Sequence, residues 1–147
     1  MRPKAQPAAV LLDTCAVVWL ANGDPLARPA LAAILHAGSR DGILISPISA
    51  WEVGLLSRPK SGRNGAVGFM PDPKTWFARI MAGPGIGEAS LTPEIAIDAS
   101  FLPGELHGDP GDRLIVASAR HLGAPIVTRD SRIIAYGRHG YVEVIPC

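Results

Sequence analysis

Short apolar runs alternate with longer stretches of helical periodicity along this chain. Continuous apolar runs of three or four residues are too short for a helix and predict buried strands at 9–12, 42–45, 126–128 and 142–145, with a shorter edge strand at 89–91. Helical spacing predicts helices at 15–20, 29–37, 93–102 and 114–122, after Ser46, and around Trp76. Strands that alternate with helices predict an α/β fold with a central, mainly parallel sheet.

The length and composition predict one aliphatic domain. The chain has 147 residues, of which 48% are hydrophobic and only 5% aromatic, so we expect a core with Trp51 and Trp76 as its large members. We expect a flexible tail over residues 1–8 and a single domain over 9–147. A net charge of +1 argues against a protein that binds nucleic acid through a basic surface over the whole molecule. No apolar run is long enough to span a bilayer, so no membrane partner is expected.

Two cysteines do not make a disulfide framework, and the chain contains no C-x-x-C pair. A reducing cytoplasm is therefore the expected location. Cys15 lies in an apolar segment and is interpreted as a small buried hydrophobic side chain.

Acidic residues follow or adjoin the predicted strands. Asp13 ends the first strand and Asp130 follows the strand at 126–128, so parallel pairing places both carboxylates at one edge of the sheet. Glu52 lies about one and a half turns into the helix after Ser46. Asp112 lies at the start of another helix. Four acids from distant segments are thus predicted to converge on one site.

Converging carboxylates repel one another unless a cation lies between them. Oxygen ligands with few histidines favour Mg²⁺ or Mn²⁺ over zinc, and such ions keep water molecules that can meet phosphate oxygens. A bound ion lowers the pKa of its water and stabilises an in-line displacement. Phosphodiester hydrolysis is the chemistry that this set of residues predicts.

Several of these residues also have ordinary structural roles. Asp13 could cap the following helix, and Asp130 could be a turn residue. Asp109 before Pro110 is a good N-cap, which places Asp112 at N3, where a carboxylate suits the helix dipole. Glu52 is different, because an unpaired carboxylate among apolar neighbours is costly to bury. Hydroxyl groups that could assist the acids, or cap helices instead, belong to Thr14, Ser49 and Thr128.

Five segments occur in a distinctive order along the chain, namely Val10-Leu-Leu-Asp-Thr14, Ile45-Ser-Pro-Ile-Ser-Ala-Trp-Glu-Val53, Leu91-Thr-Pro-Glu-Ile-Ala96, His107-Gly-Asp-Pro-Gly-Asp-Arg-Leu-Ile115 and Val127-Thr-Arg-Asp130. This order resembles that of PIN-domain proteins, and specifically the VapC toxins of bacterial and archaeal toxin–antitoxin pairs. Many relatives carry histidine where this chain has Cys15.

The resemblance implies a PIN-like parallel sheet of about five strands flanked by helices. It implies an endoribonuclease that depends on Mg²⁺ or Mn²⁺ and often cuts structured RNA such as tRNA or rRNA. The four acidic positions of the family match Asp13, Glu52, Asp112 and Asp130, as catalytic residues and metal ligands, with Asp109 as a helper. A VapB-like antitoxin that blocks the site, and a homodimer, are also implied.

Basic residues near the acids are candidates to hold the RNA backbone. They are Arg113, Arg129, Arg132 and, in a basic glycine-rich segment expected to be a mobile loop, Arg58, Lys60 and Arg63. Two alternatives to the RNase remain, namely a PIN nuclease acting on DNA and a non-catalytic α/β interaction module. A signalling receiver fits poorly, because Asp13 stands alone and no lysine occurs after Lys74.

Overall fold

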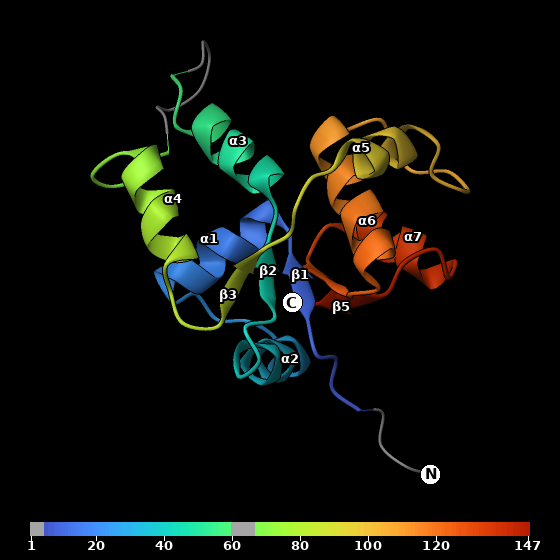
Figure 1. The fold of residues 1–147 in the computed structure, drawn as a ribbon, viewed down its shortest axis with the longest axis horizontal. Helices are drawn as coiled ribbons and strands as arrows, with labels where there is room; N and C mark the ends of the chain where they lie inside the picture. Colours follow the sequence, from blue (N-terminus) through green and yellow to red (C-terminus); the bar gives the residue numbers. More distant parts are fainter. Residues whose placement is uncertain (1–4, 60–66) are drawn as a thin grey trace.

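A five-stranded, all-parallel sheet with the strand order β3-β2-β1-β4-β5 forms the centre of the protein (Figure 1). The computed structural model describes residues 5–59 and 67–147. The strands are β1 (Val10–Leu12), β2 (Ile43–Ile45), β3 (Ile86–Glu88), β4 (Ile126–Thr128) and β5 (Val144–Pro146). The predicted α/β fold with a mainly parallel sheet is confirmed.

Several of the helices that connect the strands begin at residues that cap a helix N-terminus. The helices are α1 (Thr14–Asn22), α2 (Arg28–Gly38), α3 (Pro47–Leu56), α4 (Pro73–Met81), α5 (Pro93–Ser100), α6 (Pro110–Leu122) and α7 (Ser131–Arg138). Side chains cap the N-termini of α3 and α5, where Ser46 accepts a hydrogen bond from Ile48 N and Thr92 accepts one from Ile95 N. A proline follows each of these caps, at a position where its missing N–H costs nothing.

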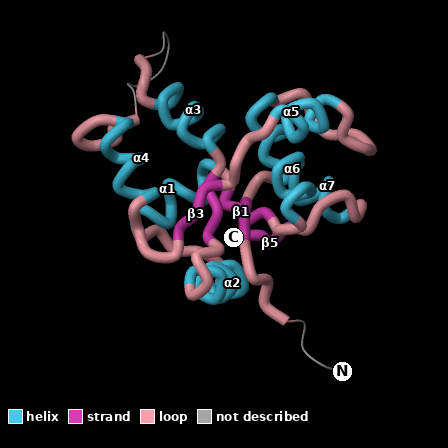
Figure 2. The backbone as a smooth tube through the Cα atoms, viewed as in Figure 1, coloured by secondary structure: helices cyan, strands magenta, loops and turns pink. Residues whose placement is uncertain are grey.

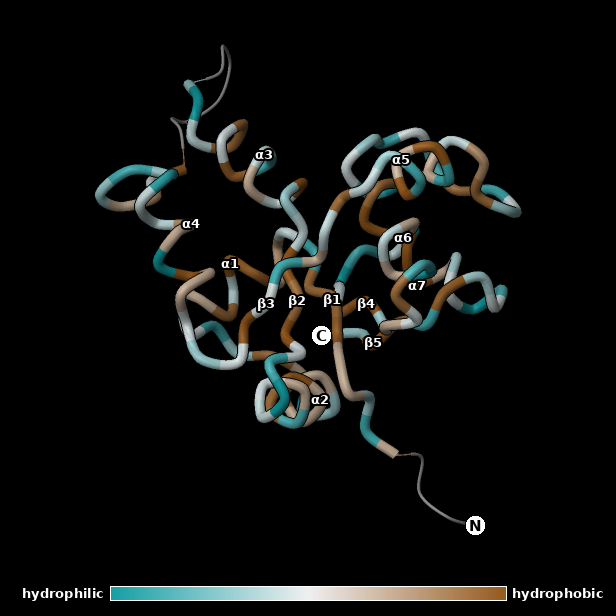
Figure 3. Tube along the Cα trace, viewed as in Figure 1, coloured by the Kyte–Doolittle hydropathy of each residue, from teal (hydrophilic) through white to brown (hydrophobic). Residues whose placement is uncertain are grey.

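Alternate residues of the strands face two separate cores, because successive side chains of a strand point to opposite faces. Val10 and Leu12 pack with Ile45 against α1, α2 and α4 on one face. Leu11 and Ile126 pack with α6 and α7 on the other face. All of these strand residues are nearly or fully buried, and the hydropathy colouring of Figure 3 shows the strands as an apolar centre.

The helices form groups on either side of the sheet in the ribbon and tube views (Figures 1 and 2). α1, α3 and α4 lie together on one side, α5, α6 and α7 lie together on the other, and α2 lies at the end of the molecule nearer the N-terminus. α3 also contacts α6. The carboxyl ends of β1 and β4 are therefore bordered by the starts of helices from both groups.

Three expectations from the sequence need correction. The edge strand is Ile86–Glu88 rather than 89–91, because it pairs in parallel with Ile43–Ile45 and the chain leaves the sheet after that pairing ends. Trp51 is 52% exposed, because it lies on the outer side of α3, so only Trp76 joins the core. Cys15 is exposed, because α1 turns its first residues toward the acidic end of the sheet.

Some expectations fall partly outside the described part of the chain. Residues 5–8 precede β1 without regular structure, and residues 1–4 of the expected tail are not described. Most of the expected basic loop, residues 60–66, is also not described. Within residues 5–59 and 67–147, no helix combines the length and the hydrophobicity needed to cross a bilayer.

Candidate active site

Two of the predicted acids stand where parallel strands end. Asp13 follows β1 and caps α1, accepting a 2.8 Å hydrogen bond from Ala16 N at Oδ1. Asp130 follows β4 and caps α7. Thr128, which is fully buried at the end of β4, accepts a 2.9 Å hydrogen bond from Asp130 N and donates its hydroxyl to Asp13 Oδ2. One hydroxyl thus links the two carboxylate-bearing turns.

Glu52 reaches this edge from α3 and is held by hydroxyls of two elements. Thr14 Oγ1, in the first turn of α1, donates a 2.7 Å hydrogen bond to Glu52 Oε1. Ser49 Oγ lies 3.0 Å from the same threonine oxygen. Because the single hydroxyl proton of Thr14 goes to the carboxylate, Ser49 is the donor to Thr14. The predicted roles of Thr14 and Ser49 near an acid thus have a geometric basis, whereas the sequence alone allowed local capping equally well.

Asp112 lies in the first turn of α6. Asp109 caps this helix and accepts a 2.9 Å hydrogen bond from Asp112 N. His107 Nε2 lies 2.7 Å from Asp112 Oδ2. Gly111 packs on Glu52 so closely that a Cβ there would lie 3.0 Å from Glu52 Cδ and Oε1. A larger residue at position 111 would therefore have to displace the Glu52 carboxylate by a few tenths of an ångström where α6 meets α3.

The carboxylates influence one another electrostatically, which places them in one neighbourhood. Burial raises the pKa of Asp13, and repulsion from Asp112 and Asp130 raises it further, against hydrogen bonds that lower it. Burial and repulsion likewise raise the pKa values of Glu52 and Asp112.

Cys15 lies beside the same acids. Partial burial of its thiol, together with repulsion from Asp13, Glu52, Asp112 and Asp130, raises its pKa to about 11. All four carboxylates are therefore near enough to act on this one side chain, and the thiol stays protonated at neutral pH.

The donor set suits a hard divalent cation, although it is not a preformed cage. Among the described residues, no three histidine, cysteine, aspartate or glutamate side chains are placed to ligate one ion together. Mg²⁺ is usually bound through one or two carboxylates and retains several waters, so it does not need such a cage. Carboxylates whose pKa values are raised by burial, and further by repulsion from one another, are stabilised in their charged form by a cation.

The candidate RNA-binding arginines divide into two groups. Arg113 donates to the carbonyls of Ala99 and Leu106 at 3.0 Å each, so its guanidinium joins α6 to the preceding segment. Arg129 donates to Cys147 O and Pro25 O and lies over the ring of Trp19. Both side chains thus hold the fold together.

Arg132 and Arg58 are placed differently. The Arg132 side chain is 60% exposed, with Nη2 3.6 Å from Asp130 Oδ2. Arg58 is exposed just after α3. Lys60 and Arg63 lie outside the described residues.

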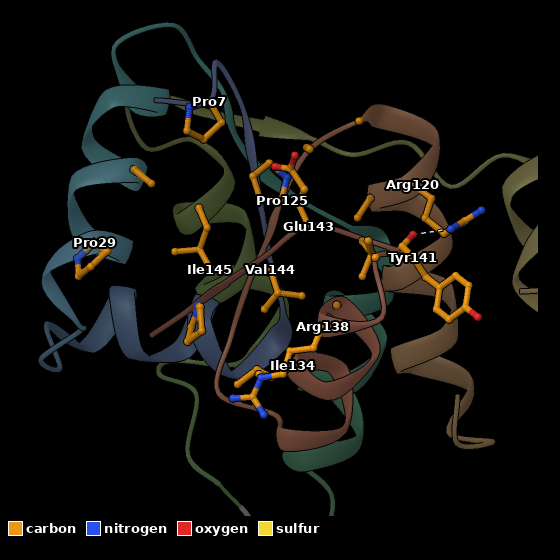
Figure 4. Close-up of a pocket in the computed structure, with 18 of the residues that line it drawn as sticks. Pro7, Pro29, Arg120, Pro125, Ile134, Arg138, Tyr141, Glu143, Val144 and Ile145 are labelled. Carbon is orange, nitrogen blue, oxygen red and sulfur yellow. Dashed lines mark hydrogen bonds between the residues drawn. The ribbon is translucent and has the colours of Figure 1, made fainter. Parts of the chain in front are cut away.

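A large hollow lies between β5 and the helices beside it (Figure 4). It measures about 1020 Å³ and is lined by β5, by the residues that precede β4, and by parts of α2, α6 and α7. Arg120 at its rim donates to the carbonyl of Tyr141. None of the four carboxylates lines it, so size alone does not locate the chemistry.

His107 was missed as a site residue by sequence reasoning, because a histidine in a loop is usually solvated. In the structure its side chain is only 15% exposed and contacts Asp112. Its position two residues before the capping Asp109 was the signal available in the sequence. Gly111, between the cap and Asp112, was likewise not recognised as a contact of Glu52.

Comparison with known proteins is consistent with this geometry. The chain matches the PIN domain family over residues 10–138, a range that includes all four carboxylates. It is 31% identical over 131 residues to ribonuclease VapC22 of Mycobacterium tuberculosis, a match that covers 88% of this chain and 92% of that protein.

Two solved structures have the same fold. A crystal structure of VapBC2 from Rickettsia felis, bound to a DNA fragment from its promoter, matches with a TM-score of 0.61 and 15% identity, covering 94% of this chain and 98% of that one. A crystal structure of DNA-bound VapBC from Salmonella typhimurium matches with a TM-score of 0.63 and 17% identity, covering 94% and 97%.

Proposed function

This chain belongs to the PIN domain family, in its VapC branch, and we propose that it is a metal-dependent endoribonuclease and the toxin of a VapBC-type toxin–antitoxin pair. The observation that carries the proposal is the set of contacts that joins the four carboxylate-bearing segments at the carboxyl edge of the sheet. Thr128 links Asp13 to the turn of Asp130, Thr14 donates to Glu52, and Gly111, next to Asp112, packs on Glu52. The proposal treats residues 9–147 as one PIN domain, because the strands of the sheet run from Val10 to Pro146.

Asp13 and Asp112 are the residues that we expect to hold Mg²⁺ or Mn²⁺, with Glu52 and Asp130 completing the ring of negative charge. When bound, the ion supplies an activated water and stabilises charge on the phosphate. The chain's own contribution is positioning. Ala16 N and Thr128 donate to the two oxygens of Asp13, and Thr14 donates to one oxygen of Glu52, so protein donors fix the direction of both carboxylates.

Burial gives the site its second property. Asp13 is 8% exposed, and the helix starts around it limit access of water. Electrostatic interactions are stronger in such surroundings than in bulk water, so the carboxylates act strongly on a cation and on a water molecule between them. Asp109 assists by fixing the first turn of α6 and hence the backbone that carries Asp112.

The partners follow from the same site. An acidic site that requires a cation can also be occupied by a basic side chain, and this supports a VapB-like antitoxin that blocks the site. We expect tRNA or rRNA to be the substrate. The cytoplasm is the expected location of the protein, because it contains these RNAs. Two large apolar side chains are exposed in this region, Ile97 in α5 and Phe101 directly after it, and they support burial of that surface in a homodimer.

A cleavage assay on structured RNA tests the enzyme directly. We expect the purified chain to cut tRNA or rRNA with Mg²⁺ or Mn²⁺ and to lose this activity in EDTA. The cleavage rate of Asp13→Asn should be at least about a hundredfold lower than that of the wild type. This loss is larger than the loss expected when a group that only orients a metal ligand is removed. Asp98→Asn, on the exposed side of α5, is the matched control and should keep wild-type activity.

Three results would contradict the proposal. Cleavage that survives Asp13→Asn would show that Asp13 does not carry the chemistry. A contaminating nuclease or a metal-independent mechanism would then account for the cleavage. Cleavage of DNA but not RNA under the same conditions would favour the PIN nuclease acting on DNA. Absence of cleavage of either nucleic acid would favour the non-catalytic interaction module.

A further inference from the structure

A second hollow of about 680 Å³ lies beside the carboxylates. Its walls come from the segment before α6, from Arg113 in the first turns of α6, and from α7. The lining residues used below are His107, Arg113, Arg132, Ala135 and Tyr136. This volume lies in the range of about 300–1,000 Å³ that is typical of small-molecule sites and is sufficient for one nucleotide.

Two lining residues also contact the acids, so the hollow and the active site share walls. His107 Nε2 lies 2.7 Å from Asp112 Oδ2. Arg132 Nη2 lies 3.6 Å from Asp130 Oδ2. A strand whose scissile phosphate sits among the four carboxylates therefore has this hollow directly beside it.

The charge of the hollow is opposite to that of the acidic site. Arg113 and Arg132 contribute two permanent positive charges, against Glu105 as the acidic side chain of the lining. Arg113 is fixed by two backbone carbonyls, and the more exposed Arg132 can turn toward a ligand. Carboxylates repel the phosphates of RNA, so a strand is held best where a cationic surface adjoins the acids.

The rest of the wall is preformed. Tyr136 is 2% exposed, and its hydroxyl donates a 2.5 Å hydrogen bond to Pro103 O. This bond holds α7 against the segment between α5 and α6. Gly104 has φ +66°, a conformation that favours glycine, and a Cβ there would collide with the ring of Tyr141. The hollow therefore exists before a ligand arrives.

We propose that this hollow is a subsite for an RNA backbone phosphate next to the bond that is cut, with Arg132 as the side chain that contacts the phosphate and Arg113, fixed by two carbonyls, as a source of positive charge in the wall. This inference rests on the proposed ribonuclease function and adds where the strand runs, namely from the carboxylates toward α7. The contact recognises phosphate and carries no base sequence information by itself.

Ala135 offers a test that leaves the acids and their partners in place. It is exposed on α7 and lines the hollow. Ala135→Glu introduces a negative charge there, and Ala135→Gln is the neutral control of nearly the same size. A second pair is Arg132→Ala, inside the hollow, and Arg138→Ala, on the same helix but lining the other hollow.

The measurement is fluorescence anisotropy of a labelled single-stranded oligoribonucleotide, titrated in EDTA over several salt concentrations so that no cleavage occurs. Ala135→Glu and Arg132→Ala should each weaken binding about tenfold and lower the slope of log Kd against log salt by about 0.7 per lost phosphate contact. Ala135→Gln and Arg138→Ala should stay within about twofold of wild type.

The outcomes separate the two claims. Equal binding by Ala135→Glu and Ala135→Gln, or equal losses for Arg132→Ala and Arg138→Ala, would overturn the subsite while wild-type cleavage of RNA still supported the ribonuclease. If the wild type neither binds nor cuts RNA, both the subsite and the proposed function fail.

Discussion

His107 Nε2 lies 2.7 Å from Asp112 Oδ2 and joins the loop before α6 to a carboxylate of the active site. Both side chains are largely shielded, with 15% and 20% exposed. The other ring nitrogen, Nδ1, is buried with no hydrogen-bond partner among the described residues. The imidazole therefore directs its polar contact to Asp112 and fixes the direction in which that carboxylate points.

We predict that His107→Ala weakens Mn²⁺ binding by about 10- to 100-fold, the usual effect of losing a group that orients a metal ligand. His107→Gln should restore part of this affinity, because its amide N–H can still donate to Asp112. Isothermal titration with Mn²⁺ measures both. Equal affinity of the alanine variant and the wild type would show that the contact does not orient a ligand.

Glu52→Gln should stabilise the metal-free protein at neutral pH. The amide oxygen still accepts the hydrogen bond from Thr14, while the charge that Asp112, Asp109 and Asp13 repel is removed. We expect a Tm higher by roughly 2–4 °C in EDTA, the shift that about 1 kcal/mol produces in a domain of this size. The same variant should lose RNA cleavage.

The pH dependence of this gain has a definite sign. The pKa of Glu52 in the folded protein is raised above its ordinary value of 4.5, so the folded state favours the protonated form. The stability that this group contributes is fully present below pH 4.5 and is lost as pH rises through the folded pKa. The advantage of Glu52→Gln should therefore appear at pH 7–8 and vanish near pH 4; a constant advantage would contradict this cause.

Arg129→Ala should weaken the fold more than it weakens RNA binding. The guanidinium holds Cys147 O at 2.8 Å and Pro25 O at 2.7 Å and lies 3.9 Å from the centre of the Trp19 ring. Loss of these contacts should lower the free energy of unfolding by about 1–3 kcal/mol in urea titrations. If the variant keeps its stability but binds RNA more weakly, Arg129 contacts the substrate and does not hold the fold together.

Phe101→Asp should convert the proposed homodimer to monomer, because Phe101 is 79% exposed at the end of α5 and a charge there cannot be buried in an interface at low cost. Light scattering after gel filtration measures the mass. Leu35→Asp, at a 67% exposed position on α2, is the control and should leave the dimer intact. Dissociation by the α2 variant instead would place the interface elsewhere.

The sequence predicted the features that local chemistry determines. Apolar runs located β1, β2, β4 and β5, and the rule that parallel strands end at one edge brought Asp13 and Asp130 together before any coordinates. The Asp109-Pro110 cap was also predicted and is confirmed by the hydrogen bond from Asp112 N. Asp13 and Asp130 each cap a helix as well, so the structural and the proposed catalytic roles coexist.

Features that depend on tertiary contacts could not be predicted. Arg113 donates to the carbonyls of residues 99 and 106, and Arg129 donates to those of residues 25 and 147. The sequence does not show these contacts, so it cannot distinguish arginines that stabilise the fold from arginines that are free to bind RNA. It also does not show that His107 turns inward, or that Cys15 faces the acids rather than the core. These outcomes depend on how α1, α6 and α7 meet at the sheet edge.

Anomalous diffraction from crystals soaked in MnCl₂ tests the central claim most directly, because it locates the ion without relying on activity. The account predicts a manganese peak in contact with Asp13 and Asp112 at the carboxyl ends of β1 and β4, and no such peak in Asp13→Asn crystals. A saturating soak that leaves these carboxylates without a peak, or places manganese elsewhere on the molecule, would contradict it.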